Sequence, residues 1–162
     1  CAIAKLETYY PEFLLITQNI DGLHQRAGSQ KIVELHGNIW RIRCMAEGII
    51  SENREVPLCS IPPRCACSAL LRPDVVWFGE SLPPGAMNQA IAAVESCDLL
   101  LVIGTSAIVQ PAASLPLIAK KHGAYIIEIN SETTPISSLV DESLLGKAGE
   151  ILPALVDNLP RK

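Results

Sequence analysis

His36 is the residue in this sequence best placed for acid–base chemistry. It follows the apolar residues 32–35 and precedes a glycine, so we expect it at the end of a buried strand with backbone room beside it. Gln18, Asn19 and Asp21 follow another apolar run upstream. A neutral imidazole can accept a proton from a sugar hydroxyl, while amides and carboxylates orient a ribose and a water. We therefore predict His36, Asn19 and Asp21 as a catalytic set, although a single histidine at a strand end is more often structural.

Two other histidines compete with His36. His122 falls at the end of a predicted helix, where a cation interacts favourably with the helix dipole, and this is a sufficient structural reason for it. His24 is the closer rival, but it falls on what reads as a helix after Gly22.

Two further strand ends carry residues of the kind that hold a nucleotide. They are Gly104, Thr105, Ser106, Asn130, Ser131 and Glu132. A glycine lets backbone amides approach a ribose or phosphate, hydroxyls are rotatable donors, and an Asn or Glu can bind ribose hydroxyls. Each triplet alone also reads as a plain turn, but two on adjacent strands favour a binding site. No GxGxxG motif or P-loop occurs in the chain.

Cysteines are crowded into one part of the chain. Four of the six, Cys44, Cys59, Cys65 and Cys67, lie in a short stretch, while Cys1 and Cys97 stand apart. Without a secretory context, such crowding favours a metal site or reduced thiols over a disulfide framework.

The elements that must position these residues alternate between helix and strand. Helical patterns cover residues 1–10, 86–96, 111–121 and 150–159, and strands are expected at residues 13–16, 98–103 and 125–129. This order predicts an α/β fold with a doubly wound, parallel, Rossmann-like sheet. Ligands of such sheets bind beyond the carboxyl ends of the strands.

Residues 39–71 interrupt this alternation. Six of the twelve prolines and three of the six cysteines lie between Pro57 and Pro84, which excludes a central strand or a long helix there. We predict a small inserted module of zinc type at residues 39–71, with residues 1–38 and 72–162 forming the Rossmann-like domain.

Composition limits the function classes. Hydrophobic residues make up 49% of the chain, enough for a packed core. A net charge of −4 disfavours direct nucleic-acid binding. No apolar run reaches membrane-spanning length and no signal-peptide pattern is present, so we expect a soluble, cytoplasmic protein. A start at Cys1 within a helical pattern indicates a fragment or processed product.

Five segments, in this order, resemble the motifs of the sirtuin family. They are TQNIDGLH at residues 17–24, ELHG at 34–37, LRPDVVWFGE at 71–80, GTS at 104–106 and NSE at 130–132. Each is weakly specific alone, but together they extend over nearly the whole chain. The VVWFGE form is similar to that of the class III branch, which includes bacterial deacetylases and desuccinylases.

The resemblance implies an NAD-dependent protein lysine deacylase. The acyl-lysine oxygen would attack the anomeric carbon of the nicotinamide ribose and release nicotinamide, leaving an alkylimidate. His36 would then deprotonate a ribose hydroxyl that attacks this imidate. The products would be free lysine and O-acyl-ADP-ribose.

The resemblance also implies which residues bind the two substrates. Those expected to contact NAD are Gln18, Asn19, Ile20, Asp21, Gly104, Thr105, Ser106, Asn130, Ser131, Glu132 and, through its backbone, Ala148. Those expected to hold an acyl-lysine peptide as an added strand are Val76, Trp77, Phe78, Gly79, Glu80 and, in the loop with Ile108, Val109.

The sequence departs from the family in its cysteines. Many sirtuins carry two CxxC pairs, which suit tetrahedral zinc. Here Glu47 stands where the second cysteine of the first pair would be, and the second cluster reads Cys59, then Cys65 and Cys67. A structural zinc on Cys44, Cys59, Cys65 and Cys67 and a degenerate, metal-free module are both open.

A second departure lies at the start of the chain. The glycine-rich NAD loop, its arginine segment and the first strand of the family would lie upstream of Cys1, as would the Tyr and Arg that recognise acidic acyl chains. We therefore expect the parent protein to be an enzyme and the isolated chain to be weakly active or inactive.

Two other functions compete with the deacylase. A non-catalytic NAD or ADP-ribose binding module would bind nucleotide without turnover that depends on His36. In a zinc-stabilised interaction module, chelation of the metal would unfold residues 44–67, and nucleotide would have no effect on stability. The set of Gln18, Asn19, Asp21 and His36 favours the enzyme, because a binder has little use for a base beside the ribose.

Overall fold

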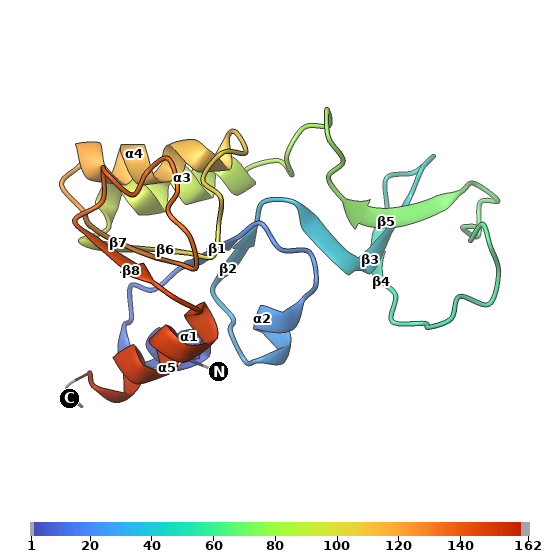
Figure 1. The fold of residues 1–162 in the computed structure, drawn as a ribbon. Helices are drawn as coiled ribbons and strands as arrows, with labels where there is room; N and C mark the ends of the chain where they lie inside the picture. The colour runs from blue at the N-terminus through green and yellow to red at the C-terminus, as the bar shows by residue number, and fades with distance from the viewer. Residues whose placement is uncertain (1, 160–162) are drawn as a thin grey trace.

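The computed structural model describes residues 2–159, in which an α/β part carries a smaller antiparallel sheet that extends away from it (Figure 1). The α/β part contains two parallel sheets. Their strands are β1 (Leu15–Thr17) with β2 (Ile32–Glu34), and β6 (Leu99–Ile103) with β7 (Tyr125–Asn130) and β8 (Glu142–Leu145). A short helix, α2 (Leu23–Arg26), lies between β1 and β2.

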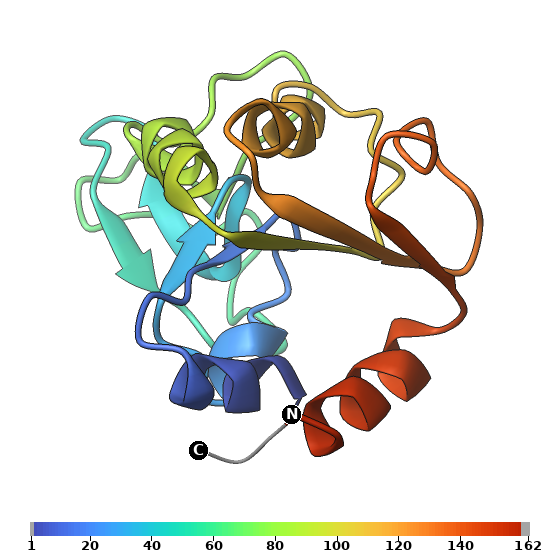
Figure 2. The same cartoon turned by 90° about the vertical axis from the view of Figure 1, so that its left-hand side faces the viewer.

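Helices cover both faces of the sheets (Figure 2). α3 (Ala86–Ser96) and α4 (Leu115–Lys121) lie side by side on one face, and α1 (Ala2–Tyr9) and α5 (Ala148–Asp157) contact each other on the opposite side. The core beneath α3 and α4 is aliphatic, with small residues on the helices that let them approach the strands closely. The predicted α/β, doubly wound fold is confirmed.

The inserted module is an antiparallel sheet in the order β4-β3-β5. Its strands are β3 (Gly37–Cys44), β4 (Ile50–Glu52) and β5 (Leu71–Val75). The sheet therefore extends a little beyond both predicted boundaries, residues 39 and 71, and the division into domains stays a prediction.

Ion pairs join this module to the α/β part. Arg41 donates from Nε to Asp74 Oδ2 at 3.2 Å and lies 2.8 Å from Glu34 Oε2 through Nη2. Arg43 donates to Asp74 Oδ1 from Nε at 3.0 Å and from Nη2 at 2.5 Å. Because both carboxylates are largely buried, their charges need these partners, and β2, β3 and β5 are held together by them.

Gly37 marks the point where the chain leaves the α/β part. Its φ is +77°, and a Cβ added there would lie 2.1 Å from the carbonyl oxygen of Asp74. Only glycine combines this backbone conformation with so close an approach of β3 to β5. The residue after His36 is therefore fixed by sterics.

Some elements differ from the sequence-based expectation. A 3₁₀ turn, η1 (Ala112–Ser114), precedes α4, so the helix predicted from residue 111 begins at Leu115, where the proline at 116 suits a first helical turn. β8 was not predicted, because it is short, mostly exposed and has no apolar run. The start of the first predicted helix, at Cys1, lies outside the described residues. Within residues 2–159 there is no helix with the length and apolar character to cross a membrane.

We predict that Gly37→Ala destabilises the protein by more than about 2 kcal/mol, because it adds a steric clash to the usual cost of a left-handed backbone. Gly123→Ala is the matched control: Gly123 has φ +91° and no atom within 4 Å of its added Cβ. Urea unfolding of both variants measures the difference. Equal losses for the two variants would contradict the close approach at Gly37.

Candidate functional site

The carboxyl ends of the parallel strands lie at one edge of the α/β part. β1 pairs with β2 and β6 pairs with β7 in parallel register, so each pair ends at the same side. Gln18, just after β1, donates from Nε2 to Thr105 Oγ1, just after β6, at 3.4 Å. This contact brings the ends of the two sheets together.

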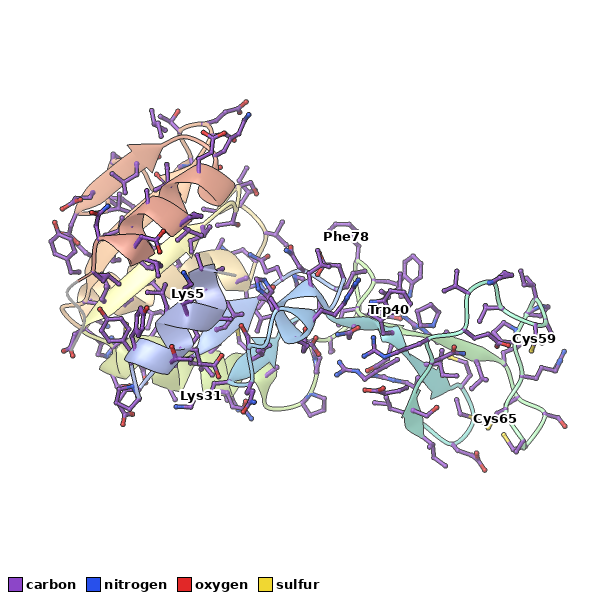
Figure 3. The ribbon with its side chains drawn as sticks, turned by 90° about the horizontal axis from the view of Figure 1, so that it is seen from below. Lys5, Lys31, Trp40, Cys59, Cys65 and Phe78 are labelled. Carbon is purple, nitrogen blue, oxygen red and sulfur yellow. The ribbon has the colours of Figure 1, made fainter. Side chains whose placement is uncertain are left out.

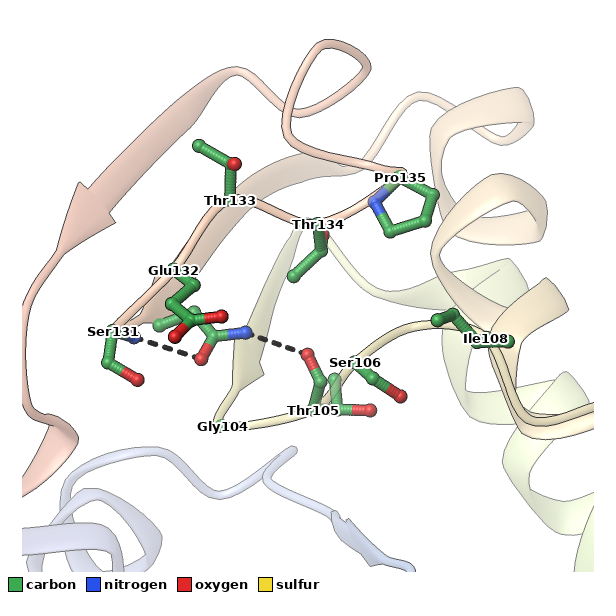
Figure 4. A pocket seen from close by; sticks show the side chains of 10 residues that line it. Gly104, Thr105, Ser106, Ile108, Ser131, Glu132, Thr133, Thr134 and Pro135 are labelled. Atoms are coloured by element: carbon green, nitrogen blue, oxygen red, sulfur yellow. Dashed lines mark hydrogen bonds between the residues drawn. The ribbon is translucent and has the colours of Figure 1, made fainter.

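A cavity of about 330 Å³ opens between the ends of β6 and β7 (Figure 4). The six residues predicted there for nucleotide binding all line it: Gly104, Thr105, Ser106, Asn130, Ser131 and Glu132. Ile108, Thr133, Thr134 and Pro135 complete the wall, and the last three were not predicted. The lining is rich in hydroxyl, amide and carboxylate groups, which suit ribose and adenine more than an apolar ligand.

Hydrogen bonds fix the two strand ends to each other. Asn130 Nδ2 donates to the Thr105 carbonyl at 2.8 Å, and Asn130 Oδ1 accepts from the Ser131 amide at 2.9 Å. Thr105 Oγ1 accepts from the Ala107 amide at 3.2 Å. Because the Asn130 side chain is used in this way, its main contribution is to shape the cavity wall.

A buried carboxylate supports the far wall. Glu128 on β7 is 1% exposed and accepts hydroxyl hydrogen bonds from Ser137 at 2.5 Å, from Ser143 at 3.0 Å and from Thr134. Burial raises its pKa, but the bonds from Ser137, Thr134 and Ser143 outweigh that effect and hold the pKa below its usual value. Glu128 thus anchors the loop that carries Thr134 and Pro135. A charge within the run of isoleucines at 126–129 was the sequence signal for it.

The loop after β1 lies beside the segment that contains His36. The Leu35 amide donates to the Thr17 carbonyl and the Ile39 amide donates to the Ile20 carbonyl, both at 2.9 Å. Gln18 and Asn19 lie between these bonds on one segment and His36 on the other, so the two backbone segments run side by side, with Asp21 directly after Ile20. The Asp21 carboxylate also accepts from the Leu23 amide at 2.9 Å at the start of α2, and its carbonyl accepts from Trp40 Nε1 at 2.8 Å.

The segment predicted to bind peptide leads away from His36. The Val76 amide donates to the His36 carbonyl at 3.0 Å. The next residues form a tight turn, because Glu80 accepts from the Trp77 amide at 3.0 Å and from Arg72 at 2.6 and 2.9 Å. The turn leaves Trp77 58% and Phe78 99% exposed. Figure 3 labels Phe78 beside the base of the inserted module. Two large apolar side chains are thus held in solvent directly after the residue whose amide bonds to His36.

Two other predicted contact residues lie at the margins. Val109 is 42% exposed and follows Ile108, which lines the cavity. Ala148 begins α5 and does not line the cavity. The Gly146 amide donates to the Asn130 carbonyl at 2.8 Å, so the start of α5 still lies next to the end of β7.

The cysteine cluster differs in one member from the predicted set. Cys44, Cys65 and Cys67 come together with Glu47, their ligand atoms lying within 4.8 Å of one another. Cys59 lies outside this group, in an exposed stretch six residues before Cys65. The turn after Cys44 instead brings Glu47 back to the side of Cys44. Three thiols and a carboxylate are a donor set that fits a structural zinc ion.

Comparison with known proteins gives consistent matches. The Sir2 family model matches residues 1–111. An NAD-dependent protein deacylase of Aquifex aeolicus (strain VF5) is 49% identical over 161 residues, which are 99% of this chain and 67% of that protein. NAD-dependent protein deacylase 2 of Pyrobaculum aerophilum is 50% identical over 162 residues, 99% of this chain and 65% of that protein. The chain thus spans about two thirds of these relatives.

Solved structures match over nearly the same residues. A Sir2 homologue in complex with NAD superposes with a TM-score of 0.92 at 49% identity, covering 96% of this chain and 61% of that one. A Sir2 complex with a p53 peptide and NAD⁺ superposes with a TM-score of 0.89 at 36% identity, covering 96% and 67%.

We predict that Glu128→Gln loosens the loop at residues 131–137. An amide has one acceptor oxygen, so it cannot accept all the hydroxyl bonds of the carboxylate, and the loss is expected to cost about 1–3 kcal/mol in stability. Hydrogen exchange should become faster in this loop, while Glu132→Gln, an exposed neighbour, should leave exchange unchanged. Unchanged exchange in Glu128→Gln would contradict the anchoring role.

We also predict that the hydrogen bonds of Glu80 in the turn at residues 77–80 persist below the ordinary pKa of a glutamate. Hydrogen bonds from Arg72 and from the Trp77 amide lower the pKa of Glu80 to about 2. Since the pKa is lowered on folding, the contribution of Glu80 is complete above its ordinary pKa of about 4.3 and is lost as the pH falls towards 2. An NMR titration of the Trp77 amide should show its change in that window. In Glu80→Gln the change should be absent; a transition near pH 4.3 in the unaltered protein would disprove the pairing.

Proposed function

This chain belongs to the Sir2 family, and on that premise we propose that its protein is an NAD-dependent protein lysine deacylase. The resemblance of the five motifs to sirtuins is confirmed by the family match and by relatives about half identical over nearly the whole chain. Because the chain spans 67% and 65% of the first two relatives, the activity is assigned to the protein and not to the isolated chain.

One observation carries this proposal: the loop after β1, the segment with His36 and the cavity at β6 and β7 share one edge of the sheets. The paired backbone bonds at Thr17–Leu35 and Ile20–Ile39 support a joint site for Asn19, Asp21 and His36. The Gln18–Thr105 hydrogen bond connects that site to the cavity. A dinucleotide is long enough to occupy both places, with its adenosine half in the cavity and its nicotinamide ribose beside His36.

The residues at this edge then have different roles in the reaction. When bound, NAD supplies an anomeric carbon with nicotinamide as its leaving group, and a ribose hydroxyl next to it. His36 accepts the proton of that hydroxyl, so that the oxygen can take up the acyl group of lysine. Gln18, Asn19 and Asp21 orient the ribose and the amide of nicotinamide. The residues of the cavity hold the adenosine half.

The acyl-lysine peptide binds as an added strand between residues 76–80 and the loop at Ile108 and Val109. Both segments present exposed apolar side chains, among them Trp77, Phe78 and Ile108. Backbone hydrogen bonds give affinity that depends little on the peptide sequence. A relative solved with a p53 peptide and NAD⁺ supports this class of substrate.

We place the reaction in the cytoplasm. The five described cysteines, at positions 44, 59, 65, 67 and 97, are all free, as expected where thiols stay reduced.

The proposal predicts that His36→Gln in the complete protein lowers the steady-state formation of deacylated peptide from NAD and acetyl- or succinyl-lysine peptide by about 10²- to 10⁴-fold, because His36 acts after nicotinamide has left. ADP-ribose affinity, measured by calorimetry, should stay within about twofold, because the imidazole acts on a proton and contributes little to binding. His122→Gln, at the exposed end of α4, is the matched control and should retain full activity. If His24→Gln abolished turnover and His36→Gln did not, the base would be His24; if neither mattered while ADP-ribose bound tightly, the protein would be a binding module.

A further inference from the structure

Two turns of the inserted module bring Glu47 to three cysteines. The first turn follows β3, where the Gly48 amide donates to the Cys44 carbonyl at 2.9 Å. The second turn is closed by the Ser68 amide, which donates to the Cys65 carbonyl at 2.9 Å. The Met45 amide donates to the Leu70 carbonyl at 3.0 Å and joins the two turns. The four side chains therefore converge through the backbone of the module, on segments about twenty residues apart.

The distances in this group are those of a tetrahedral centre. Zinc bonds of about 2.3 Å to sulfur and about 2.1 Å to oxygen imply tetrahedral edges of about 3.8 Å between two sulfurs and about 3.6 Å between sulfur and oxygen. Cys44 Sγ lies 3.5 Å from Cys67 Sγ, and Cys65 Sγ lies 3.6 Å from Glu47 Oε2. All four ligand atoms lie within 4.8 Å of one another, so a small contraction would complete the coordination.

Glu47 has no other role in the described part of the chain. Among residues 2–159 it forms no ion pair, and Arg64, a cation near the second turn, donates instead to the Ser68 carbonyl at 2.7 Å. The Glu47 carboxylate therefore has no cationic side chain as a partner among the described residues, and its oxygen lies with the three sulfur atoms.

We propose that Glu47 is the fourth ligand of a structural Zn²⁺ ion, with Cys44, Cys65 and Cys67, and that Cys59 is not a ligand. Binding displaces the thiol protons into solvent and leaves three Zn–S bonds and one Zn–O bond. A carboxylate satisfies Zn²⁺ less well than a thiolate does, because zinc is borderline soft. This site therefore holds its ion less tightly than four thiolates would, and Glu47→Cys strengthens it.

The absorption of bound Co²⁺ reports how many thiolates coordinate the metal. The reduced, chelator-stripped protein is titrated with Co²⁺, and the sulfur-to-cobalt charge-transfer absorption is compared between variants, with bound zinc measured by mass spectrometry of the intact protein. We expect Cys59→Ser to match the unaltered protein, Cys65→Ser to lose about a third of the absorption, and Glu47→Cys to gain about a third. Glu47→Gln should bind Zn²⁺ at least about 10-fold more weakly in competition with a chelating dye.

The opposite pattern would overturn the assignment. If Cys59→Ser lost a third of the absorption and Glu47→Gln bound zinc normally, Cys59 would be the fourth ligand. Absence of stoichiometric zinc or cobalt in the reduced protein, or a Cys44–Cys67 disulfide in its place, would remove the site altogether. Glu47→Cys and Cys59→Ser keep the test decisive even if Glu47→Gln unfolds. These readouts measure metal alone, so they are independent of whether the protein is a deacylase.

Discussion

The arrangement of this protein depends on the close approach of β3 and β5 at Gly37. The left-handed backbone of Gly37 and the missing Cβ let the chain turn directly after His36 with the Asp74 carbonyl against it. Because Val76 then donates to the His36 carbonyl, the residue before the turn and the segment beyond β5 are fixed relative to each other. One steric constraint thus sets the position of His36, of the inserted module and of the exposed turn at residues 77–80.

Hydrogen bonds and ion pairs of Glu34 hold the segment around His36 in place. Glu34 lies two residues before His36 and accepts from Gln25 Nε2 and from Asn38 Nδ2, both at 2.6 Å, besides pairing with Arg41. Both flanks of His36 are thereby held, and Arg41 extends the network to Asp74 in the module. Partly buried ion pairs add little net stability, but removing one partner is costly, so such a network favours one orientation of the module over others. Glu128 likewise holds the cavity wall in one arrangement, but its partners are the hydroxyls of Ser137 and Ser143 and not arginines.

The sequence predicted the α/β fold and the strand-end residues because both follow from local patterns. Short apolar runs ending in Gly104, Asn130 or Gln18 indicate buried strands with polar ends, and parallel strands bring such ends to one edge. β8 escaped prediction because its residues are mostly exposed and lack an apolar run. Thr134 and Pro135 escaped because their place in the cavity depends on the bonds of Glu128, which link residues from a loop and a neighbouring strand.

The cysteine cluster shows most clearly what the sequence predicts and what only the tertiary structure decides. Residue types and spacing determined that Cys44, Cys65 and Cys67 could share an ion, and that a glutamate stood at a cysteine position. Spacing could not decide between Cys59 and Glu47, because both are near the cluster along the chain. The backbone bonds that close and join the two turns decided it, since they bring Glu47 to Cys44, Cys65 and Cys67 and leave Cys59 outside the group. The sequence by itself thus determined which chemical groups are available at each strand end and turn, while tertiary hydrogen bonds and the contact at Gly37 decided which of them meet, because convergence depends on long-range geometry that local patterns do not contain.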